Sequence, residues 1–337
     1  MKLVPAALAC VTTLVVAASG SGTETRHLPL IEAVGKLLYV SADGRHWREL
    51  APPRVLGVLG DAVFATPTSA FALSGNCAAA RGVIHSTIDA GKTWRARPAP
   101  DYPGCHAGAG AALDFLDARH GWLSVWVAEG PVARLYRTAN GGRTWRQMSE
   151  DLPCCAPVRF RTRSEGWLGG RAFFRSDDRG RTWRAVPLPR PPHTRGMWSV
   201  VTRPAFFGLN GVVAATYARH GRGVFAVYST RNGGRSWSRR ATRAIRVMDN
   251  PLPFGKIAFD ATRPGVWWAV PVGRADANVT VAVRGRVSTH RLALDGRWVV
   301  SIQALDASTA VVMGTNGRTF GLSVTSDGGR SWHDIEP

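Results

Sequence analysis

Basic side chains suited to anion recognition gather in four stretches of the C-terminal half of the chain. The first holds Arg190, His193, Arg195 and Trp198. The other three contain Arg219, His220 and Arg222, then Arg243, Arg246, Asp249 and Asn250, then Arg274 and Asp276. A guanidinium fork matches a carboxylate or a phosphate in a bidentate way. These stretches predict an anion-binding site if the fold brings them together, and the alternative interpretation is a solvated surface on an arginine-rich protein.

Motifs for other kinds of chemistry are missing from the sequence. The nine histidines show neither the H-x-x-x-H nor the H-E-x-x-H spacing of zinc sites. There is no G-x-S-x-G nucleophile motif and no glycine-rich phosphate loop before a helix. We therefore expect no metal site and no cofactor.

Arginine dominates the charge of the chain. There are 43 Lys and Arg residues against 23 Asp and Glu, a net charge of +20, and 39 of the 43 are Arg. Many of these arginines belong to a repeated motif and would be spread around the surface. The charge also predicts attraction to a polyanion. No compact run of Lys and Arg and no RNA-binding motif accompanies it, so we do not expect a specific nucleic-acid partner.

An eight-residue motif recurs along the chain and reads hydroxyl, any residue, Asp or Asn, any residue, Gly, basic, Ser or Thr, Trp. Full copies occupy residues 87–94, 138–145, 176–183, 230–237 and 325–332, and residues 41–47 form a copy shortened by one. The acidic or amide positions are Asp43, Asp89, Asn140, Asp178, Asn232 and Asp327, and the tryptophans are Trp47, Trp94, Trp145, Trp183, Trp237 and Trp332. Asp or Asn accepts hydrogen bonds from nearby backbone N–H groups, Gly adopts a positive φ, and Trp supplies apolar surface. Six copies predict a structural hairpin turn, because a catalytic Asp is needed only once.

This motif resembles the Asp-box, or BNR repeat, of sialidases, some glucanases, sortilin-type receptors and photosystem II assembly factor-like proteins. The copies extend from residue 41 to residue 332, nearly the whole chain. The resemblance implies a β-propeller, a fold that carries many unrelated activities.

A second repeat allows the blades to be counted. Segments such as residues 115–121 (F-L-D-A-R-H-G) precede the motif copies and lead from one apolar run through a polar turn into another, which predicts two inner strands. The long gap between Asn232 and Asp327 fits two blades, the hidden one at residues 258–294. We expect an all-β, seven-bladed β-propeller of four-stranded antiparallel blades, with six blades as the alternative. The first blade is incomplete, since only residues 28–34 precede its outer hairpin, and this segment is expected to close the ring.

The N-terminus predicts export. Residues 1–20 resemble a signal peptide, with Lys2, an apolar run and small residues near the end, so residues 21–337 form the single propeller domain. The expected location is secreted, periplasmic or in the cell envelope, with no transmembrane span in the mature chain. An even number of cysteines in an exported chain predicts disulfides, with three pairings open for Cys77, Cys105, Cys154 and Cys155.

These features predict a secreted, monomeric, non-catalytic Asp-box β-propeller that acts as a binding or assembly scaffold. Its expected partner is an anionic glycan, an envelope polymer or an anionic protein surface. The alternative is an extracellular exo-glycosidase of sialidase type. The resemblance to sialidases implies three arginines for the substrate carboxylate, an Asp acid/base and a Tyr activated by a Glu. No Glu lies between Glu165 and Glu336, and no residue is assigned to these catalytic roles.

Overall fold

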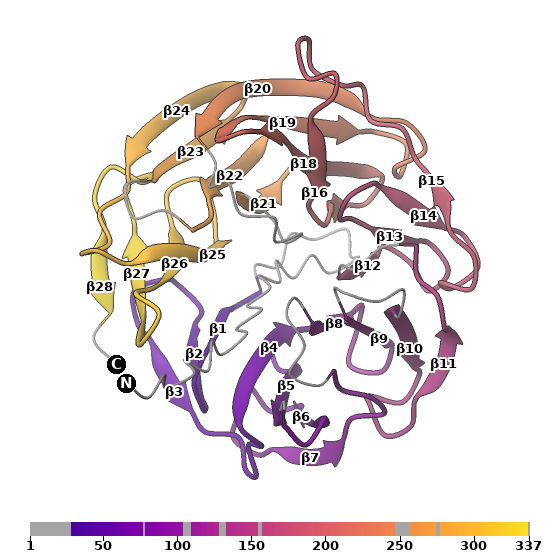
Figure 1. Cartoon of the computed structure of the whole chain (residues 1–337). Coiled ribbons are helices and arrows are strands. Elements are labelled where there is room, and N and C mark those ends of the chain that lie inside the picture. The colour runs from indigo at the N-terminus through magenta and orange to yellow at the C-terminus, as the bar shows by residue number, and fades with distance from the viewer. Residues whose placement is uncertain are drawn as a thin grey trace, which may run out of the picture.

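The chain folds as a ring of β-sheets around a central axis (Figure 1). The computed structural model describes residues 28–76, 78–103, 109–127, 133–153, 157–246, 257–273 and 277–335. Within these ranges there are seven antiparallel sheets and no helix, hence no helix that could cross a membrane. The predicted seven-bladed β-propeller is confirmed, and the six-bladed alternative is wrong.

Consecutive strands of the chain build each blade. Blade 1 consists of β1 (Leu30–Val34), β2 (Leu37–Ser41) and β3 (Arg48–Leu50). Blade 2 consists of β4 (Val58–Phe64), β5 (Ala70–Asn76), β6 (Arg81–Thr87) and β7 (Arg95–Pro98). Blade 3 consists of β8 (Gly110–Phe115), β9 (Gly121–Trp126), β10 (Ala133–Thr138) and β11 (Arg146–Ser149). Blade 4 consists of β12 (Val158–Phe160), β13 (Gly166–Leu168), β14 (Phe174–Ser176) and β15 (Arg184–Ala185).

The second half of the ring follows the same rule. Blade 5 consists of β16 (Trp198–Val201), β17 (Ala205–Phe207), β18 (Asn210–Arg219), β19 (Arg222–Thr230) and β20 (Ser238–Arg246). Blade 6 consists of β21 (Ile257–Arg263), β22 (Val266–Pro271), β23 (Asn278–Val283) and β24 (Arg286–Arg291). Blade 7 consists of β25 (Trp298–Ala304), β26 (Ala310–Thr315), β27 (Phe320–Thr325) and β28 (His333–Ile335). Blade 6 is the hidden blade predicted at residues 258–294.

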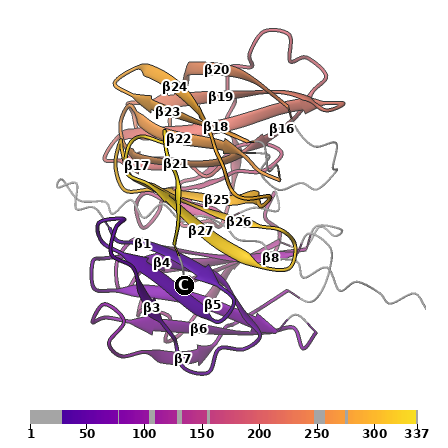
Figure 2. The same cartoon turned by 90° about the vertical axis from the view of Figure 1, so that its left-hand side faces the viewer.

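Two blades depart from four strands. Blade 1 has three in the described part of the chain, where β1 alone lies inside its outer hairpin. Blade 5 has five, since β16 and β17 both pair with β18. Among the described residues no strand is exchanged between the first and last blades; instead the Gln303 side chain accepts a hydrogen bond from Ile31 N at 3.1 Å and donates one to Ile31 O. The ring therefore closes at the N-terminal segment, with blade 7 beside blade 1 (Figure 2).

The recurring motif forms the turn between the two outer strands of its blade. In the copy at residues 176–183, Ser176 Oγ donates to Asp178 Oδ1 at 2.8 Å. Asp178 also accepts hydrogen bonds from the backbone N–H of Thr182 at 2.9 Å and from its hydroxyl at 2.6 Å. Gly180 has a φ of 89°, and Trp183 Nε1 donates to its carbonyl at 3.2 Å. Asp178 therefore accepts hydrogen bonds from donors of the turn that have no backbone acceptor there.

The same turns are tied to the inner hairpin of their own blade. A backbone N–H of the motif donates to a carbonyl of the inner turn in five blades: Ala90 to Thr68, Gly141 to Arg119, Arg179 to Ser164, Gly233 to Leu209 and Gly328 to Ser308. Blade 6 lacks the motif and keeps the bond, from Arg284 N to Gly265 O. These turns share one side of the ring, hereafter the turn face. The connections between blades lie on the opposite face.

Each motif tryptophan packs against the blade that precedes its own. The described core divides into seven clusters, one for each interface between blades, and six of them include a motif tryptophan. Trp183 of blade 4, for example, packs with Trp122 and Leu135 of blade 3. The seventh cluster joins blades 5 and 6 through Phe225 and Trp267, since blade 6 has no motif tryptophan. The repeated turn thus joins neighbouring sheets as well as strands.

Replacing Asp178 with Ala is expected to lower the free energy of unfolding by about 1–2 kcal/mol, because the N–H groups of Arg181 and Thr182 lose their acceptor. Urea unfolding would measure the change. The matched control is Arg235→Ala at the same position of the blade 5 turn, where the exposed side chain should contribute little. Equal destabilisation by the two variants would contradict a structural role for the Asp.

Candidate anion-binding site at the corner of blade 5

The loop from residue 187 to residue 197 is held in a fixed shape by its own hydrogen bonds. Thr194 is buried, and its hydroxyl donates to Pro191 O at 2.7 Å. The Arg190 guanidinium donates to Thr194 O at 2.9 Å and to Met197 O at 3.3 Å. His193 and Gly196 have φ values of 60° and 78°, which the tight return of the loop requires. A predicted ligand arginine, Arg190, therefore also organises the loop.

Two tyrosines and an arginine fasten this loop to blade 5. The Arg190 guanidinium lies over the ring of Tyr217, 5.0 Å from its centroid. The Tyr217 and Tyr228 hydroxyls are 2.9 Å apart, and Tyr228 donates to Pro189 O at 3.0 Å. Arg239 donates to Arg190 O at 2.7 Å. Burial, followed by the contact with Tyr217, raises the pKa of Tyr228, so this hydroxyl stays protonated and acts as a donor.

Three arginines stand in register across the neighbouring strands. Arg219 pairs with Arg222 at the end of the β18–β19 hairpin, and Arg222 pairs with Arg246 on β20. Residues directly opposite on antiparallel strands share a face and stand about 5 Å apart. All three side chains are exposed, and none of them forms an ion pair within the described residues. Like charges in this arrangement destabilise the sheet, and a bound anion would remove that cost.

The other residues predicted to bind the anion lie at several different places in the structure. Trp198 begins β16 beside Ala218 and is 42% exposed. Arg195 is exposed on the loop, two residues after His193. His220 has a φ of 49° and, like His193, occupies a left-handed turn position. Asp249 and Arg274 lie outside the described residues, as do all four cysteines proposed to form disulfides.

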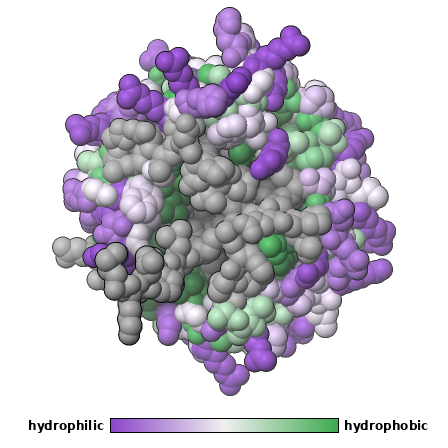
Figure 3. Space-filling model, viewed as in Figure 1, coloured by the Kyte–Doolittle hydropathy of each residue, from purple (hydrophilic) through white to green (hydrophobic). Residues whose placement is uncertain are grey.

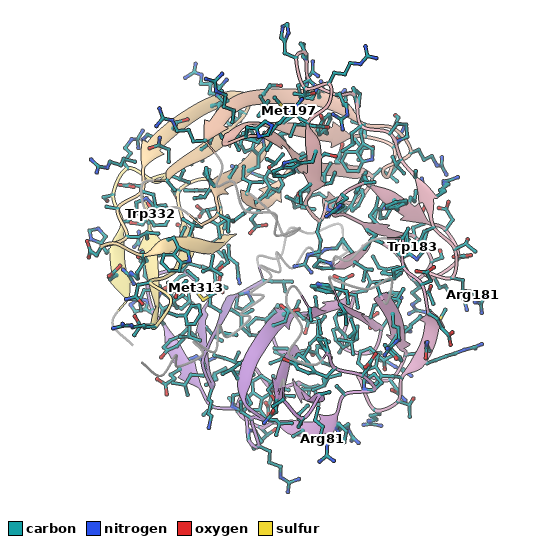
Figure 4. The ribbon with its side chains drawn as sticks, viewed as in Figure 1. Arg81, Arg181, Trp183, Met197, Met313 and Trp332 are labelled. Atoms are coloured by element: carbon teal, nitrogen blue, oxygen red, sulfur yellow. The ribbon has the colours of Figure 1, made fainter. Side chains whose placement is uncertain are left out.

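The described members of this set gather at an outer corner of the ring. The three arginines run from β18 to β20, the outermost strand of blade 5, and Met197 at the end of the loop lies near the periphery in Figure 4. In propellers, ligand-binding loops generally surround the mouth of the central channel instead. In blade 5, β18, β19 and β20 have nine or ten residues each, more than any other described strand. Hydrophilic side chains project around the rim of the molecule in Figure 3.

A second set of charged residues, which the sequence analysis did not single out, surrounds the channel. The innermost strands of blades 2, 3 and 6 carry Asp61, Asp114 and Asp260, all buried. Each accepts a hydrogen bond from a backbone N–H of the next blade, donated by Leu113 at 2.7 Å, Phe160 at 2.6 Å and Ala304 at 2.8 Å. These carboxyl groups thus join successive blades near the axis. A single charged residue inside a short apolar run, as in Leu113-Asp114-Phe115, is the signal that could have found them.

Arginine and glutamate complete this channel ring. Arg159 and Asp114 form a buried ion pair with 3.0 Å between Nη1 and Oδ1. Burial raises the pKa of Asp61 and of Asp260 to about 7 and that of Glu32 to about 8. Burial, and then the charge of Arg159, lowers the pKa of Arg203 to about 10.

The arrangement implied by the resemblance to sialidases is not formed by the described residues. Tyr39 and Glu49 are paired across β2 and β3, but these strands form the outer hairpin of blade 1. No triad of arginines accompanies them among the residues that the structure describes. Within the described ranges there is also no group of three potential metal-ligating side chains.

Comparisons with known proteins support the architecture. No family model and no curated protein sequence matches the chain. Among solved structures, YCF48 from Cyanidioschyzon merolae, a photosystem II assembly factor, is similar with a TM-score of 0.55 and 14% identity over 84% of this chain and 87% of that one. The uncharacterised protein lmo1340 from Listeria monocytogenes has a TM-score of 0.54 and 8% identity over 92% of both chains. The Hadza microbial sialidase Hz136 has a TM-score of 0.46 and 15% identity over 77% of this chain and 63% of that one. At these identities the first two similarities show the propeller fold alone.

Proposed function

We propose that the chain is an exported Asp-box β-propeller that acts, without catalysis, as a binding or assembly scaffold for an anionic partner. The partner is an acidic glycan, an envelope polymer or an acidic protein surface, bound by the monomer. The observation that carries the proposal is the row of Arg219, Arg222 and Arg246, which places three like charges side by side on a rigid sheet.

The surroundings of this row support binding over chance exposure. Tyr217 and the loop carbonyls already orient the Arg190 side chain. Ligand binding therefore does not have to offset the loss of conformational entropy of this side chain. The neighbouring Trp198 offers an exposed aromatic face. Positive charge that no ion pair within the described ranges balances attracts polyanions and accelerates their association. Several weak contacts along a polymer would add up to useful affinity.

Replacing Arg219, Arg222 and Arg246 together with Ser is expected to weaken polyanion binding at least about tenfold, since each lost charge-assisted hydrogen bond contributes about 1.5–3 kcal/mol in favourable cases. Biosensor binding to heparin, lipoteichoic acid and poly-L-glutamate would measure it and identify the partner class. Because like-charge repulsion disappears, the variant should also unfold at a slightly higher temperature than the wild type.

A matched control separates this site from net charge. The triple variant Arg143→Ser, Arg235→Ser and Arg330→Ser removes the same charge from turns of three different blades. It should retain most of the binding. Equal loss in both variants would reduce the interaction to unspecific attraction, and turnover of a fluorogenic sialoside by the purified protein would favour the exo-glycosidase instead.

A further inference from the structure

A pocket lined by four arginines lies between blades 3 and 4, away from the corner of blade 5. Its volume is about 220 Å³, and its lining includes Arg137, Arg146, Arg179 and Arg181, together with Ala139 and Trp145. Arg137 and Arg146 are cross-strand partners on β10 and β11, while Arg179 and Arg181 come from the motif turn of blade 4. None of the lining residues is acidic. Arg181 and Trp183 mark this part of the rim in Figure 4.

Blade 4 contains the equivalent arginines with their charges balanced. Arg175 precedes the motif hydroxyl of Ser176 as Arg137 precedes that of Thr138, and each guanidinium lies over the tryptophan of the adjacent strand, 5.4 Å from Trp167 and 5.9 Å from Trp122. Arg175 pairs with Glu165 at 2.9 Å and with Asp177 at 2.5 Å. Asp177 also binds Arg184, the cross-strand partner of Arg175, at 2.7 Å. Two carboxylates therefore serve this pair of arginines, and Glu165 also forms an ion pair with Arg161.

Blade 3 has lost both of these carboxylates. The repeat places His120 where blade 4 has Glu165, and Ala139 where it has Asp177. His120 is occupied elsewhere, because its Nδ1 lies 2.9 Å from Asp117 Oδ2. The buried Nε has no hydrogen-bond partner within the described part of the chain in either Arg137 or Arg175, so the two blades differ in their ion pairs and not at this atom. The blade thus keeps the basic half of an ion-pair network without the acidic half.

The charges around Arg137 act against one another. Burial lowers the pKa of Arg137, and the charges of Arg179 and then Arg163 lower it further. In blade 4, the arginine pair Arg175 and Arg184 has the carboxylate of Asp177 beside it. The corresponding pair in blade 3 has the positive charges of Arg179 and Arg181 beside it instead. An unpaired guanidinium that is partly withdrawn from water costs free energy, and an anion of opposite charge removes that cost.

We propose that this pocket binds a doubly charged tetrahedral oxyanion, a phosphate group or a sulfate ion, in place of the two missing carboxylates. Such a group supplies several acceptor oxygens and about two negative charges, the charge that Glu165 and Asp177 bring to blade 4. The guanidinium groups of Arg137 and Arg146 would hold it from the sheet, and those of Arg179 and Arg181 from the neighbouring turn. The site joins two blades, so occupation should stabilise the fold by linkage.

Calorimetric titration of the full chain with inorganic phosphate, sulfate and chloride at constant ionic strength tests the proposal. Saturable binding of phosphate or sulfate, with a rise of the unfolding temperature, is expected, and the stronger of the two identifies the group. The double variant Arg146→Ala and Arg181→Ala should weaken binding at least about tenfold. The control Arg235→Ala and Arg330→Ala, at exposed positions of two other motif turns, should bind like the wild type.

A gain of charge gives the sharper test. Ala139→Asp restores the carboxylate that Asp177 supplies in blade 4, within reach of Arg137 and Arg146. This variant should unfold at a higher temperature than the wild type without phosphate, and phosphate should no longer shift that temperature. No saturable binding to the wild type, an equal response to chloride, or undiminished binding to the Ala139→Asp variant would overturn the proposal. The same titrations in the Arg219→Ser, Arg222→Ser and Arg246→Ser background remove binding at blade 5 from these outcomes.

Discussion

Replacing Arg159 with Leu is expected to lower the free energy of unfolding by about 3–5 kcal/mol, because removal of one partner leaves a buried charge uncompensated. Arg159 is 5% exposed and Asp114 1% exposed, and they are 3.0 Å apart. Asp114 also joins blade 3 to blade 4 through Phe160 N. Without Arg159, the Asp114 carboxylate can lose its charge only by taking up a proton. The protonated carboxyl group is a poorer acceptor for the Phe160 N–H. Urea unfolding at pH 7 would measure the change.

The double variant Arg159→Leu and Asp114→Asn is the matched control. Asn keeps a side-chain oxygen for Phe160 N and carries no charge, so we expect it to recover part of the stability lost in Arg159→Leu. The single variant should also regain stability as the pH falls, because Asp114 then protonates at little cost. Two results would show that the ion pair does not hold the two blades together. One is an Arg159→Leu variant with the same urea midpoint as the wild type. The other is a double variant whose free energy of unfolding falls again by as much as that of Arg159→Leu.

The ring itself could be predicted because its determinants are local and repeated. Asp178 and Gly180 shape a turn through contacts within a few residues, and six copies of such a turn give the spacing of the sheets. Blade 6 could be counted although it lacks the motif, since Arg284 and Gly285, with φ values of 51° and 83°, form a short hairpin turn between two apolar strands. Both the residues that favour a turn and the alternation of apolar and polar side chains in a strand can be recognised within a short segment of sequence.

The charged sites could not be predicted to the same degree, because they depend on contacts between distant residues. Arg219, Arg222 and Arg246 become a row only through the register of three strands, and one residue of slip would place them on opposite faces. Asp61 and Arg203 approach the same axis from blades 2 and 5. The sequence showed many arginines but not which of them lack an acid. That distinction required comparison of Arg137 with Arg175 in space.

The channel carboxyl groups set an unusual dependence of stability on pH. Burial raises the pKa of Glu32 to about 8 and the pKa of Asp61 and of Asp260 to about 7, whereas in the unfolded chain all three titrate near 4. The folded state therefore binds more protons than the unfolded state between about pH 4 and pH 8. Across this window stability is greatest at the acidic end and is lost as the pH rises. His85, whose pKa burial lowers to about 4, acts in the opposite sense below about pH 6.5.

We expect the free energy of unfolding to fall by several kcal/mol between pH 5.5 and pH 8, with Glu32 alone contributing roughly 3 kcal/mol at one pKa unit per 1.36 kcal/mol. Three carboxyl groups outweigh the single imidazole, whose contribution is mostly complete above pH 6.5. Urea midpoints at pH 5.5, 7 and 8 would measure the trend. Glu32→Gln keeps an acceptor for the Ser301 hydroxyl and removes the charge, so it should stabilise the protein at pH 8 and flatten the profile. A profile that rises toward pH 8, or one that Glu32→Gln leaves unchanged, would show that water or an ion reaches the channel ring and keeps these groups ionised at no cost to the fold.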